Sequence, residues 1–355
     1  MNTDNIYKHI LYVGPNYKEP KGGIAAVLHA YSTGVSPFYC VVSTKGGKKI
    51  KLFTCYITAI FKYLYYLFKP SIKIIHIHGS SNGSFWRKAF LILIARSFKK
   101  KIIYHIHGGG FKIFAKRHPK AVPFILGKCD IIIALSDFWK KYFEEELHCR
   151  SVYIIPNVIE EPHEDHGKRT NDICNFLFLG KVCHYKGIFD LLDTIGDKKE
   201  KYVNKIKIYI GGGGEIERLN KTIEQYGLKD IVEYIGFVTG KKKENYLNDA
   251  HVFILPSYIE GVPISILEAM SYHLPIISTN VGGIPEILHD GEEGYIFEPG
   301  NKEQLAEKIN KILASNDDRM KMGIRAFQIS QPYIISNVLN ELNSLYSKLL
   351  IKNDK

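Results

Sequence analysis

The sequence lacks the marks of several large protein classes. Its six cysteines are scattered, with no C-x-x-C pair and no metal-ligand spacing, so neither a disulfide framework nor a metal site is expected. No apolar signal-peptide core precedes the first expected strand. The apolar run 54–68 is too short for a membrane span and is interrupted by Lys62. We therefore expect a cytoplasmic protein, whose 355 residues are enough for about two domains.

Several motifs of nucleotide and hydrolase chemistry are also absent. No G-x-G-x-x-G is followed by an acidic ribose binder, which disfavours a nicotinamide cofactor, and no G-x-x-x-x-G-K-[ST] exists, which excludes a P-loop NTPase. The run His107-Gly-Gly-Gly is similar to an esterase oxyanion motif, but the G-x-S-x-G elbow that an esterase needs is missing. No helix-turn-helix, zinc-finger or RNP-like pattern favours a nucleic-acid partner.

Acidic residues are scarce in the first half of the chain. Residues 1–150 hold 24 Lys and Arg against 7 Asp and Glu, and residues 51–100 hold nine basic residues and no acidic one, among many Phe, Tyr and Trp. A nucleic-acid surface, an anionic membrane surface and a solvated face around a buried helix are the three explanations. We favour peripheral membrane contact through this basic N-terminal domain.

Short β-branched runs alternate with helical patterns along the whole chain. This alternation predicts parallel sheets with helices on both faces, and two such series predict an α/β protein of two Rossmann-like domains. The expected strands are Ile10–Val13, Ile72–His76, Lys101–His105, Ile131–Leu135, Val152–Ile155, Phe176–Leu179, Ile206–Ile210, Val232–Ile235, Val252–Leu255, Pro275–Ser278 and Gly294–Phe297.

The domain boundary is also readable. Residues 161–172 are polar and charged and lack periodicity, which predicts a linker between an N-terminal domain, 1–160, and a C-terminal domain, 173–331. Residues 332–355 form a helical tail. Ligands of open parallel sheets bind beyond the carboxyl ends of the strands, so the cleft between the two domains is the expected site.

The most informative segment runs from Glu260 to Glu268. It lies between two expected strands, and Pro263 fits the first turn of a helix there. The free amides of Ile264, Ser265 and Ile266 would then form an anion site flanked by two carboxylates. Such a site suits a nucleotide sugar, which has a diphosphate and hydroxyl-rich ends. Glutamates near helix starts also simply complement the helix dipole, so the neighbouring motifs must decide.

Basic and glycine-rich turns follow other expected strands. Lys181 and Lys186 come after Phe176–Leu179 and can neutralise a diphosphate, although surface lysines are common. The glycine run that starts at Gly211 lets a backbone approach a ligand, or is simply a flexible turn.

Two further features belong to the N-terminal domain. The turn Gly22-Gly23 opens a helical pattern and could close over phosphates, although it also fits an ordinary strand–helix turn. His107 follows Lys101–His105, where it can position hydroxyls or transfer protons. His76 and His78 end a similar strand and are expected to be structural.

Together these residues resemble the retaining glycosyltransferases of family 4, which have the GT-B fold. The match is ordered and specific from Ala250 to Gly294, and it includes the family's E-x7-E spacing at Glu260 and Glu268. Weaker matches extend it over both halves of the chain, at 22–23, 105–108, 155–157, 177–187, 208–219 and 233–238.

The resemblance implies roles for the candidate residues. Glu260 holds the hydroxyls of the donor sugar near the reacting carbon, Glu268 holds the ribose, and His107 is the acceptor-side histidine. Lys186 and Lys181 bind the diphosphate and stabilise the departing nucleotide, although position 181 is usually Arg in the family, so the bidentate fork is lost. The other donor-binding positions are Gly22, Gly23, Gly211, Val238, Val262, Pro263 and Ile264.

The resemblance also implies a reaction and a setting. The reaction is metal-independent, cofactor-free glycosyl transfer with retained configuration, with a UDP-sugar as the favoured donor, and the tail 332–355 returns to the N-terminal domain. The leading hypothesis is a peripheral enzyme on the inner face of the cell membrane. It would extend a lipid-linked glycan of a surface polysaccharide, such as lipopolysaccharide O-antigen, capsule or exopolysaccharide. A soluble acceptor and a non-catalytic nucleotide-sugar-binding protein are the alternatives.

Overall fold

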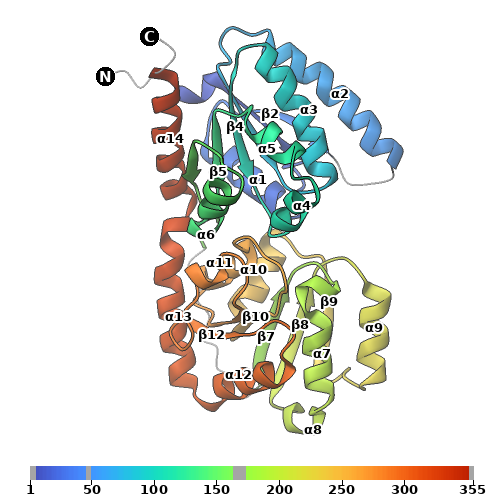
Figure 1. Cartoon of the computed structure of the whole chain (residues 1–355). Helices are drawn as coiled ribbons and strands as arrows, with labels where there is room; N and C mark the ends of the chain where they lie inside the picture. The colour runs from blue at the N-terminus through green and yellow to red at the C-terminus, as the bar shows by residue number, and fades with distance from the viewer. Residues whose placement is uncertain (1–4, 45–48, 163–172, 352–355) are drawn as a thin grey trace. The chain divides into compact units, whose positions relative to one another are not determined.

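The computed structural model describes residues 5–44, 49–162 and 173–351, which form two compact units (Figure 1). Unit 1 runs from the N-terminus to Glu160 and from Tyr333 onward, and unit 2 is Glu161–Pro332. Each unit is built on one six-stranded sheet whose strand pairs are parallel. The predicted α/β class, with two Rossmann-like parallel-sheet units, is confirmed. Most of the predicted linker, 163–172, lies outside the described residues.

The sheet of unit 1 has the strand order β2-β1-β3-β4-β5-β6. The chain passes from β1 to β2 and then returns to the other side of β1, so the topological switch point lies between β1 and β3. The central strands are buried along their whole length because helices cover both faces, which explains their near-continuous Ile-rich sequences. The strands are β1 Ile10–Pro15, β2 Tyr39–Thr44, β3 Ile74–Gly79, β4 Lys101–Ile106, β5 Ile131–Ala134 and β6 Val152–Ile154.

Two layers of helices sandwich this sheet. On one face, Tyr31 of α1 packs edge-on against His78, and Tyr346 of α14 packs against His76. On the other face, Phe85 of α3 packs against Tyr104 of β4. The helices of unit 1 are α1 Gly23–Gly34, α2 Lys49–Leu67, α3 Gly83–Ser97, α4 Phe111–Arg117, α5 Ala121–Leu126, α6 Asp137–Lys141 and the C-terminal α14 Ile335–Ile351.

The sheet of unit 2 has the order β12-β11-β10-β7-β8-β9, so its switch point lies between β7 and β10. On its helical layers, α7 contacts α9 and α12, and α11 contacts α13. The strands are β7 Cys174–Leu179, β8 Ile206–Gly211, β9 Val232–Gly236, β10 Val252–Leu255, β11 Ile276–Thr279 and β12 Gly294–Phe297. The helices are α7 Ile188–Gly196, α8 Lys199–Tyr202, α9 Ile216–Gln225, α10 Gly240–Asp249, α11 Ile264–Ser271, α12 Lys302–Ala314 and α13 Asn316–Ser330.

Every expected strand is present, and the structure adds β2 and α13, which the sequence pattern does not predict. β2 is an edge strand that is only partly buried, so its apolar signal is weak. α13 contains Gly323, which normally disfavours a helix interior. A Cβ at Gly323 would lie 2.2 Å from the carbonyl oxygen of His273, so the glycine lets α13 pack closely on the loop after α11.

Candidate active site

The loops that follow β7 and β10 touch each other at the switch point of unit 2. Gly187 has a φ of +66°, and a Cβ there would lie 1.8 Å from the carbonyl oxygen of Pro256. The amide of Tyr258 donates to the carbonyl of Tyr185 at 2.9 Å. Only glycine tolerates both the left-handed backbone and the close approach. The contact fixes the two loops that carry Lys186 and Glu260.

Lys186 and Glu260 form an ion pair in the described structure. The ammonium of Lys186 contacts Oε1 of Glu260, and Ser257 donates its hydroxyl to the same oxygen at 2.7 Å. The side chain of Glu260 is 8% exposed and that of Lys186 is 26% exposed. A cation and a hydrogen-bond donor on the same oxygen compensate the cost of burying this carboxylate. Lys186 and Glu260 are both among the predicted donor-site residues, whereas Ser257, two residues after the end of β10, is a partner to which the sequence pattern assigns no role.

The start of α11 differs slightly from the prediction. Pro263 is the N-cap residue with φ −70° and ψ 122°, one position before the helical residues, so its predicted place in the first turn is wrong. The amide of Ile266 bonds to the carbonyl of Pro263 at 3.1 Å and is therefore not free. Among the described residues, none accepts a hydrogen bond from the amides of Ile264 and Ser265. Val262 and Pro263 themselves are buried at this helix end.

The glycine run after β8 is needed for packing between two loops. A Cβ at Gly212 would lie 1.8 Å from the carbonyl oxygen of Gly180, and one at Gly214 would lie 2.1 Å from that of Val182. Gly213 is different, because a Cβ there meets no atom within 4 Å. The candidate donor residues Gly211 and Val238 lie side by side. Val238 is buried, and its Cγ2 atom would lie 3.3 Å from a Cβ at Gly211. The remaining candidate in this region, Lys181, is exposed.

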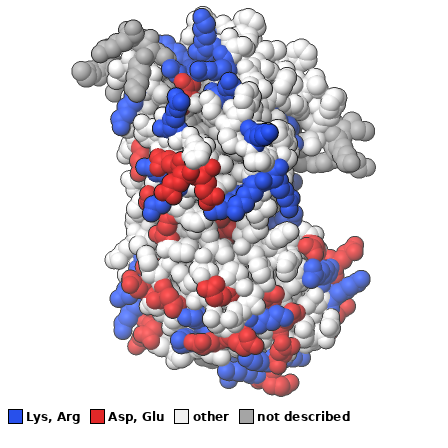
Figure 2. All heavy atoms as spheres, viewed as in Figure 1, with Lys and Arg blue, Asp and Glu red and all other residues white. Residues whose placement is uncertain are grey.

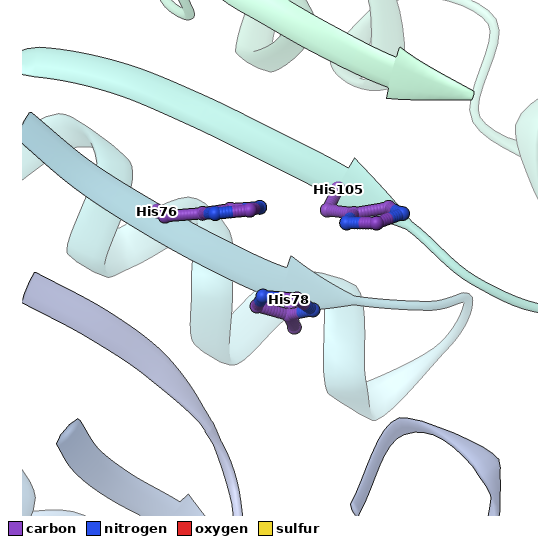
Figure 3. Close-up of side chains that lie close together, drawn as sticks. All are labelled: His76, His78 and His105. Carbon is purple, nitrogen blue, oxygen red and sulfur yellow. The ribbon is translucent and has the colours of Figure 1, made fainter. Parts of the chain in front are cut away.

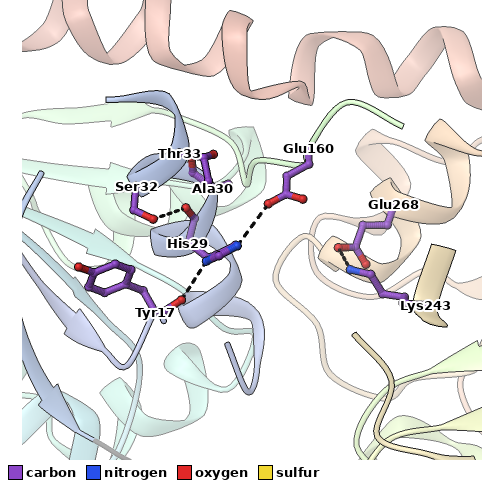
Figure 4. A network of polar contacts seen from close by, with 8 residues as sticks. All are labelled: Tyr17, His29, Ala30, Ser32, Thr33, Glu160, Lys243 and Glu268. Carbon is purple, nitrogen blue, oxygen red and sulfur yellow. Dashed lines mark hydrogen bonds and ion pairs between the residues drawn. The ribbon is translucent and has the colours of Figure 1, made fainter. Parts of the chain in front are cut away.

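Glu268 lies in α11 and pairs with a lysine that the sequence analysis does not single out. Nζ of Lys243, from α10, donates to Oε1 of Glu268 at 2.7 Å (Figure 4). The two side chains are 28% and 20% exposed. The candidate residues Lys186, Glu260 and Glu268 therefore belong to two separate ion pairs of unit 2, Lys186–Glu260 and Lys243–Glu268.

The candidates Gly22 and Gly23 lie in unit 1, at the exposed start of α1. Gly22 is the N-cap with φ +110°, which favours glycine, and a Cβ there would meet no atom within 4 Å. The preceding loop is tied to α1 by His29, whose Nδ1 lies 3.0 Å from the carbonyl oxygen of Tyr17 (Figure 4). Nε2 of His29 lies 3.8 Å from Glu160.

His107 also lies in unit 1, directly after β4, and both of its ring nitrogens are engaged. Nδ1 lies 3.1 Å from Oδ1 of Asn157, so it carries the proton and donates. Nε2 then accepts from Nδ1 of His78, 3.0 Å away. Burial lowers the pKa of His107 to about 4, and the Asn157 hydrogen bond opposes this shift in part. The chain His78–His107–Asn157 thus holds a neutral imidazole in one tautomer.

Figure 3 shows the neighbouring imidazoles, His76, His78 and His105, on β3 and β4. The H-x-H pattern occurs on both strands, and the pairing of His78 with His105 in the sheet places all four histidines on one face. Desolvation lowers the pKa of His76 to about 3 and that of His105 well below its usual value, so this core is neutral. The hydroxyl of Tyr346 donates to Tyr12 at 3.2 Å and lies 2.6 Å from Nδ1 of His76, which ties α14 to the cluster.

These three imidazoles are also close enough to be considered as metal ligands. One nitrogen from each of His76, His78 and His105 lies within 4.8 Å of the others. The rings of His76 stack on those of His78 and His105, with interplanar angles of 25° and 12°. Stacked rings do not direct their in-plane nitrogens at one common point, and Nδ1 of His76 and Nδ1 of His78 are already held in hydrogen bonds. We therefore assign the three imidazoles to the core of unit 1 and not to a metal centre.

Two family models match consecutive parts of the chain. The model described as "Glycosyltransferase Family 4" matches residues 24–161, all but the last of which lie in unit 1. The model described as "Glycosyl transferases group 1" matches residues 158–329, which cover nearly all of unit 2. Together the two models leave only the two ends of the chain unmatched.

Individual glycosyltransferases are also similar to the chain, but each over a smaller part of it. The chain is 31% identical to a 2-deoxystreptamine N-acetyl-D-glucosaminyltransferase of Niallia circulans, over 51% of the chain and 46% of that protein. It is 27% identical to the amylovoran biosynthesis glycosyltransferase AmsD of Erwinia amylovora, over 62% of the chain and 63% of that protein. The chain thus covers less than two thirds of these relatives.

Among solved structures, the chain is similar to Anabaena HepE in complex with UDP and glucose. The TM-score is 0.76, and the match covers 96% of the chain and 99% of HepE. At 15% identity this likeness shows the fold alone.

Proposed function

This chain belongs to family 4 of the glycosyltransferases, and from that premise we propose that it moves a glycosyl residue from a nucleotide sugar to a glycan acceptor with retention of configuration. The observation that carries the proposal is the Lys186–Glu260 pair at the switch point of unit 2. It offers a cation for a phosphate and a carboxylate for sugar hydroxyls at the position where open parallel sheets bind their ligands.

In the proposed reaction, the donor diphosphate replaces Glu260 as the ion-pair partner of Lys186. The diphosphate is also bound by the ammonium of Lys181 and by the amides of Ile264 and Ser265. Glu260 is thereby released and accepts hydrogen bonds from hydroxyls of the donor sugar. The bond from the anomeric carbon to the phosphate oxygen breaks, and the negative charge that develops on the diphosphate is held by fixed cations and helix-end amides.

The acceptor hydroxyl attacks the same face of the sugar and forms the new glycosidic bond. Its proton passes to the departing phosphate oxygen, so that no metal is required to balance the charge. On the acceptor side, the neutral His107 contacts the transferred sugar, while His78 and Asn157 keep its ring in position.

We infer that the donor is a UDP-sugar. Support comes from HepE, which has a similar fold and was solved with UDP and glucose. Glu268 is the group proposed to hold the ribose, because it lies about a turn inside α11, behind the helix end that faces the diphosphate.

We further infer that the acceptor is a lipid-linked glycan of a surface polysaccharide, such as O-antigen, capsule or exopolysaccharide, presented at the inner face of the cell membrane. The relative in amylovoran biosynthesis supports a polysaccharide product. A soluble acceptor is the competing possibility, and the partitioning of the acceptor into detergent or water separates the two.

A thermal-shift panel of UDP-, GDP-, ADP- and CMP-sugars tests the donor site. We expect UDP-sugars to raise the Tm, since a ligand that binds only the folded state stabilises it by RT ln(1 + [L]/Kd). The shift should vanish in Glu268→Ala and persist in Glu303→Ala, which removes an exposed carboxylate of α12. No shift with any nucleotide class would contradict the proposal. Binding without turnover on any acceptor would favour a non-catalytic nucleotide-sugar-binding protein.

A further inference from the structure

We propose that the outer surface of α2 and α3 in unit 1 docks on an anionic lipid bilayer. This surface, the α2–α3 face, consists of Phe53, Ile57, Phe61, Tyr65, Phe68, Trp86, Phe90 and Leu93. It sharpens the proposed function by naming the surface that would meet a membrane-bound acceptor. Binding of the protein to vesicles is measured without donor or turnover, so the docking proposal and the proposed function can fail separately.

The first observation is the inverted polarity of α2. Its exposed positions recur every three or four residues, which places them on one side of the helix. On this side Phe53, Phe61 and Tyr65 are 66%, 70% and 60% exposed, and Phe68, just after the helix, is 73% exposed. A surface helix of a globular protein normally turns polar residues outward. In residues 52–67 of α2, by contrast, four of the seven exposed side chains are large and apolar, and the other three are Thr54, Thr58 and Lys62.

α3 repeats the inversion. Trp86, Phe90 and Leu93 are 44%, 48% and 41% exposed, and their spacing of four and three residues aligns them on one side. On the inner side, Lys88 is only 1% exposed, and its ammonium contacts the hydroxyl of Ser43. A lysine side chain is thus buried while three large apolar side chains face outward, which is the reverse of the usual distribution.

The two helices are neighbours, so their outer sides form one surface. The hydroxyl of Tyr56 in α2 donates to the carbonyl of Arg87 in α3 at 2.8 Å, and that of Tyr63 donates to Leu91 at 3.1 Å. Figure 1 shows α2 beside α3, and in Figure 2 the surface over them is mostly white. An exposed apolar surface formed by eight large side chains is larger than scattered surface residues would produce and marks an interaction site.

Charge identifies the occupant as an anionic bilayer. From residue 20 to residue 129 the sequence holds 19 Lys and Arg and no Asp or Glu. An apolar, aromatic surface in a region whose charged residues are all basic fits the interface of an anionic membrane. At that interface aromatic rings lie at the level of the headgroups, and basic residues contact the lipid phosphates. Nucleic acid would be bound through phosphate contacts and would not favour an apolar centre. None of the described helices is long and apolar enough to cross a bilayer.

Cosedimentation with vesicles of equal parts phosphatidylglycerol and phosphatidylcholine tests the proposal. We expect the wild-type chain to sediment with these vesicles and Phe61→Gln/Phe90→Gln to partition at least tenfold less. Phe237→Gln is the matched control, because Phe237 is 53% exposed but lies in unit 2. All the changed side chains are about half exposed or more, and an unchanged melting curve establishes that each variant folds.

Intrinsic fluorescence gives a second readout. The chain has two tryptophans, and Trp86 lies on the α2–α3 face whereas Trp139 is buried at 4% exposure. Insertion of the face predicts a blue shift and quenching by brominated lipids, which Trp86→Phe should remove. If the protein bound vesicles of pure phosphatidylcholine as strongly as those with phosphatidylglycerol, the proposed preference for an anionic bilayer would be overturned. No sedimentation at low salt, equal loss in the Phe237→Gln control, or self-association that the double variant abolishes without any vesicle binding would each overturn the proposal.

Discussion

Units 1 and 2 share one construction, six parallel strands with a switch point beside a central strand, but different side chains occupy the carboxyl ends of those strands. In unit 2 the loops after β7 and β10 bring Lys186 and Glu260 into an ion pair. In unit 1 the ends of β3 and β4 carry His78 and His107, which are neutral and hydrogen-bonded to each other. The same sheet edge therefore carries a Lys–Glu ion pair in one unit and neutral, hydrogen-bonded imidazoles in the other.

The surfaces of the two units differ as well. In α9 of unit 2 the buried residues are Leu219 and Ile223, and the outer side carries charges such as Arg218, which pairs with Glu215. In α2 of unit 1 the exposed side chains include the large apolar residues Phe53, Ile57, Phe61 and Tyr65. Because water-facing helices are normally polar outside, the comparison indicates that α9 faces water and that α2 is shaped for another environment.

The largest expected effect is a difference between the units in acid. Burial holds the pKa of His107 at about 4 and that of His76 at about 3, whereas the unfolded chain takes up protons near 6.5. The unfolded state therefore binds more protons as the pH falls below 6.5, and the stability of unit 1 falls with it. At pH 5 each such histidine lowers the free energy of unfolding of unit 1 by roughly 2 kcal/mol. We expect unit 1 to unfold before unit 2.

Tryptophan fluorescence and far-UV circular dichroism can separate the two events. Both tryptophans, Trp86 and Trp139, belong to unit 1, so their fluorescence reports that unit alone. The fluorescence midpoint should lie at a higher pH than the second circular-dichroism transition. The variant His105→Gln removes one buried imidazole and should lower the fluorescence midpoint. Coincident transitions would show that the histidine core does not distinguish the units.

The next effect concerns the ion pair of unit 2. Lys186→Met should reduce kcat about 10²–10³-fold, the usual result of removing one group that stabilises developing charge. It should also lower the free energy of unfolding by about 1–3 kcal/mol, because Glu260 is left buried without its cation.

A double variant separates these two roles. Lys186→Met/Glu260→Gln should recover most of the lost stability, since no unpaired charge remains, but none of the lost activity. Stability is measured by urea unfolding and activity by release of the nucleotide. If the double variant recovered activity along with stability, the pair would be purely structural.

A third comparison lies within the glycines of unit 2. Gly187→Ala should destabilise the unit by about 2–4 kcal/mol, because the left-handed backbone and the clash with Pro256 both oppose a side chain. Gly213→Ala is the matched control, with open space around the new methyl, and should stabilise slightly or not at all. If the two variants changed the free energy of unfolding in urea equally, the loops after β7 and β10 would be able to move apart without loss of stability.

Much of the fold can be predicted from the sequence because buried parallel strands leave continuous apolar runs that glycines and charges interrupt. The weaker signals belong to β2, which lies at a sheet edge, and to α13, whose Gly323 serves a close packing contact. Local propensity disfavours glycine in a helix, and only the tertiary structure reveals why it is tolerated there.

The candidate site is readable where function depends on residues close in sequence, and less so where it depends on partners from other elements. The spacing of Glu260 and Glu268 is visible in one segment of the chain. The partner of Glu268, Lys243, lies on α10 and is found only once that helix is placed. Ser257 lies only three residues before Glu260, but its role depends on how the loop after β10 folds back. Likewise, Asn157 lies 50 residues from His107, so the hydrogen bond that fixes the tautomer of that histidine leaves no local pattern.

The smallest expected effect tests how far the Lys186–Glu260 and Lys243–Glu268 pairs differ. Lys243→Ala removes the partner of Glu268, but both side chains are partly exposed, so the loss of stability should be below about 1 kcal/mol. A Glu268 relieved of its lysine remains able to accept hydrogen bonds from a ribose, so the Kd for the donor should change less than tenfold. Calorimetric titration with the nucleotide sugar measures this change. A loss of binding as large as that expected for Glu268→Ala would mean that Lys243 itself holds the donor.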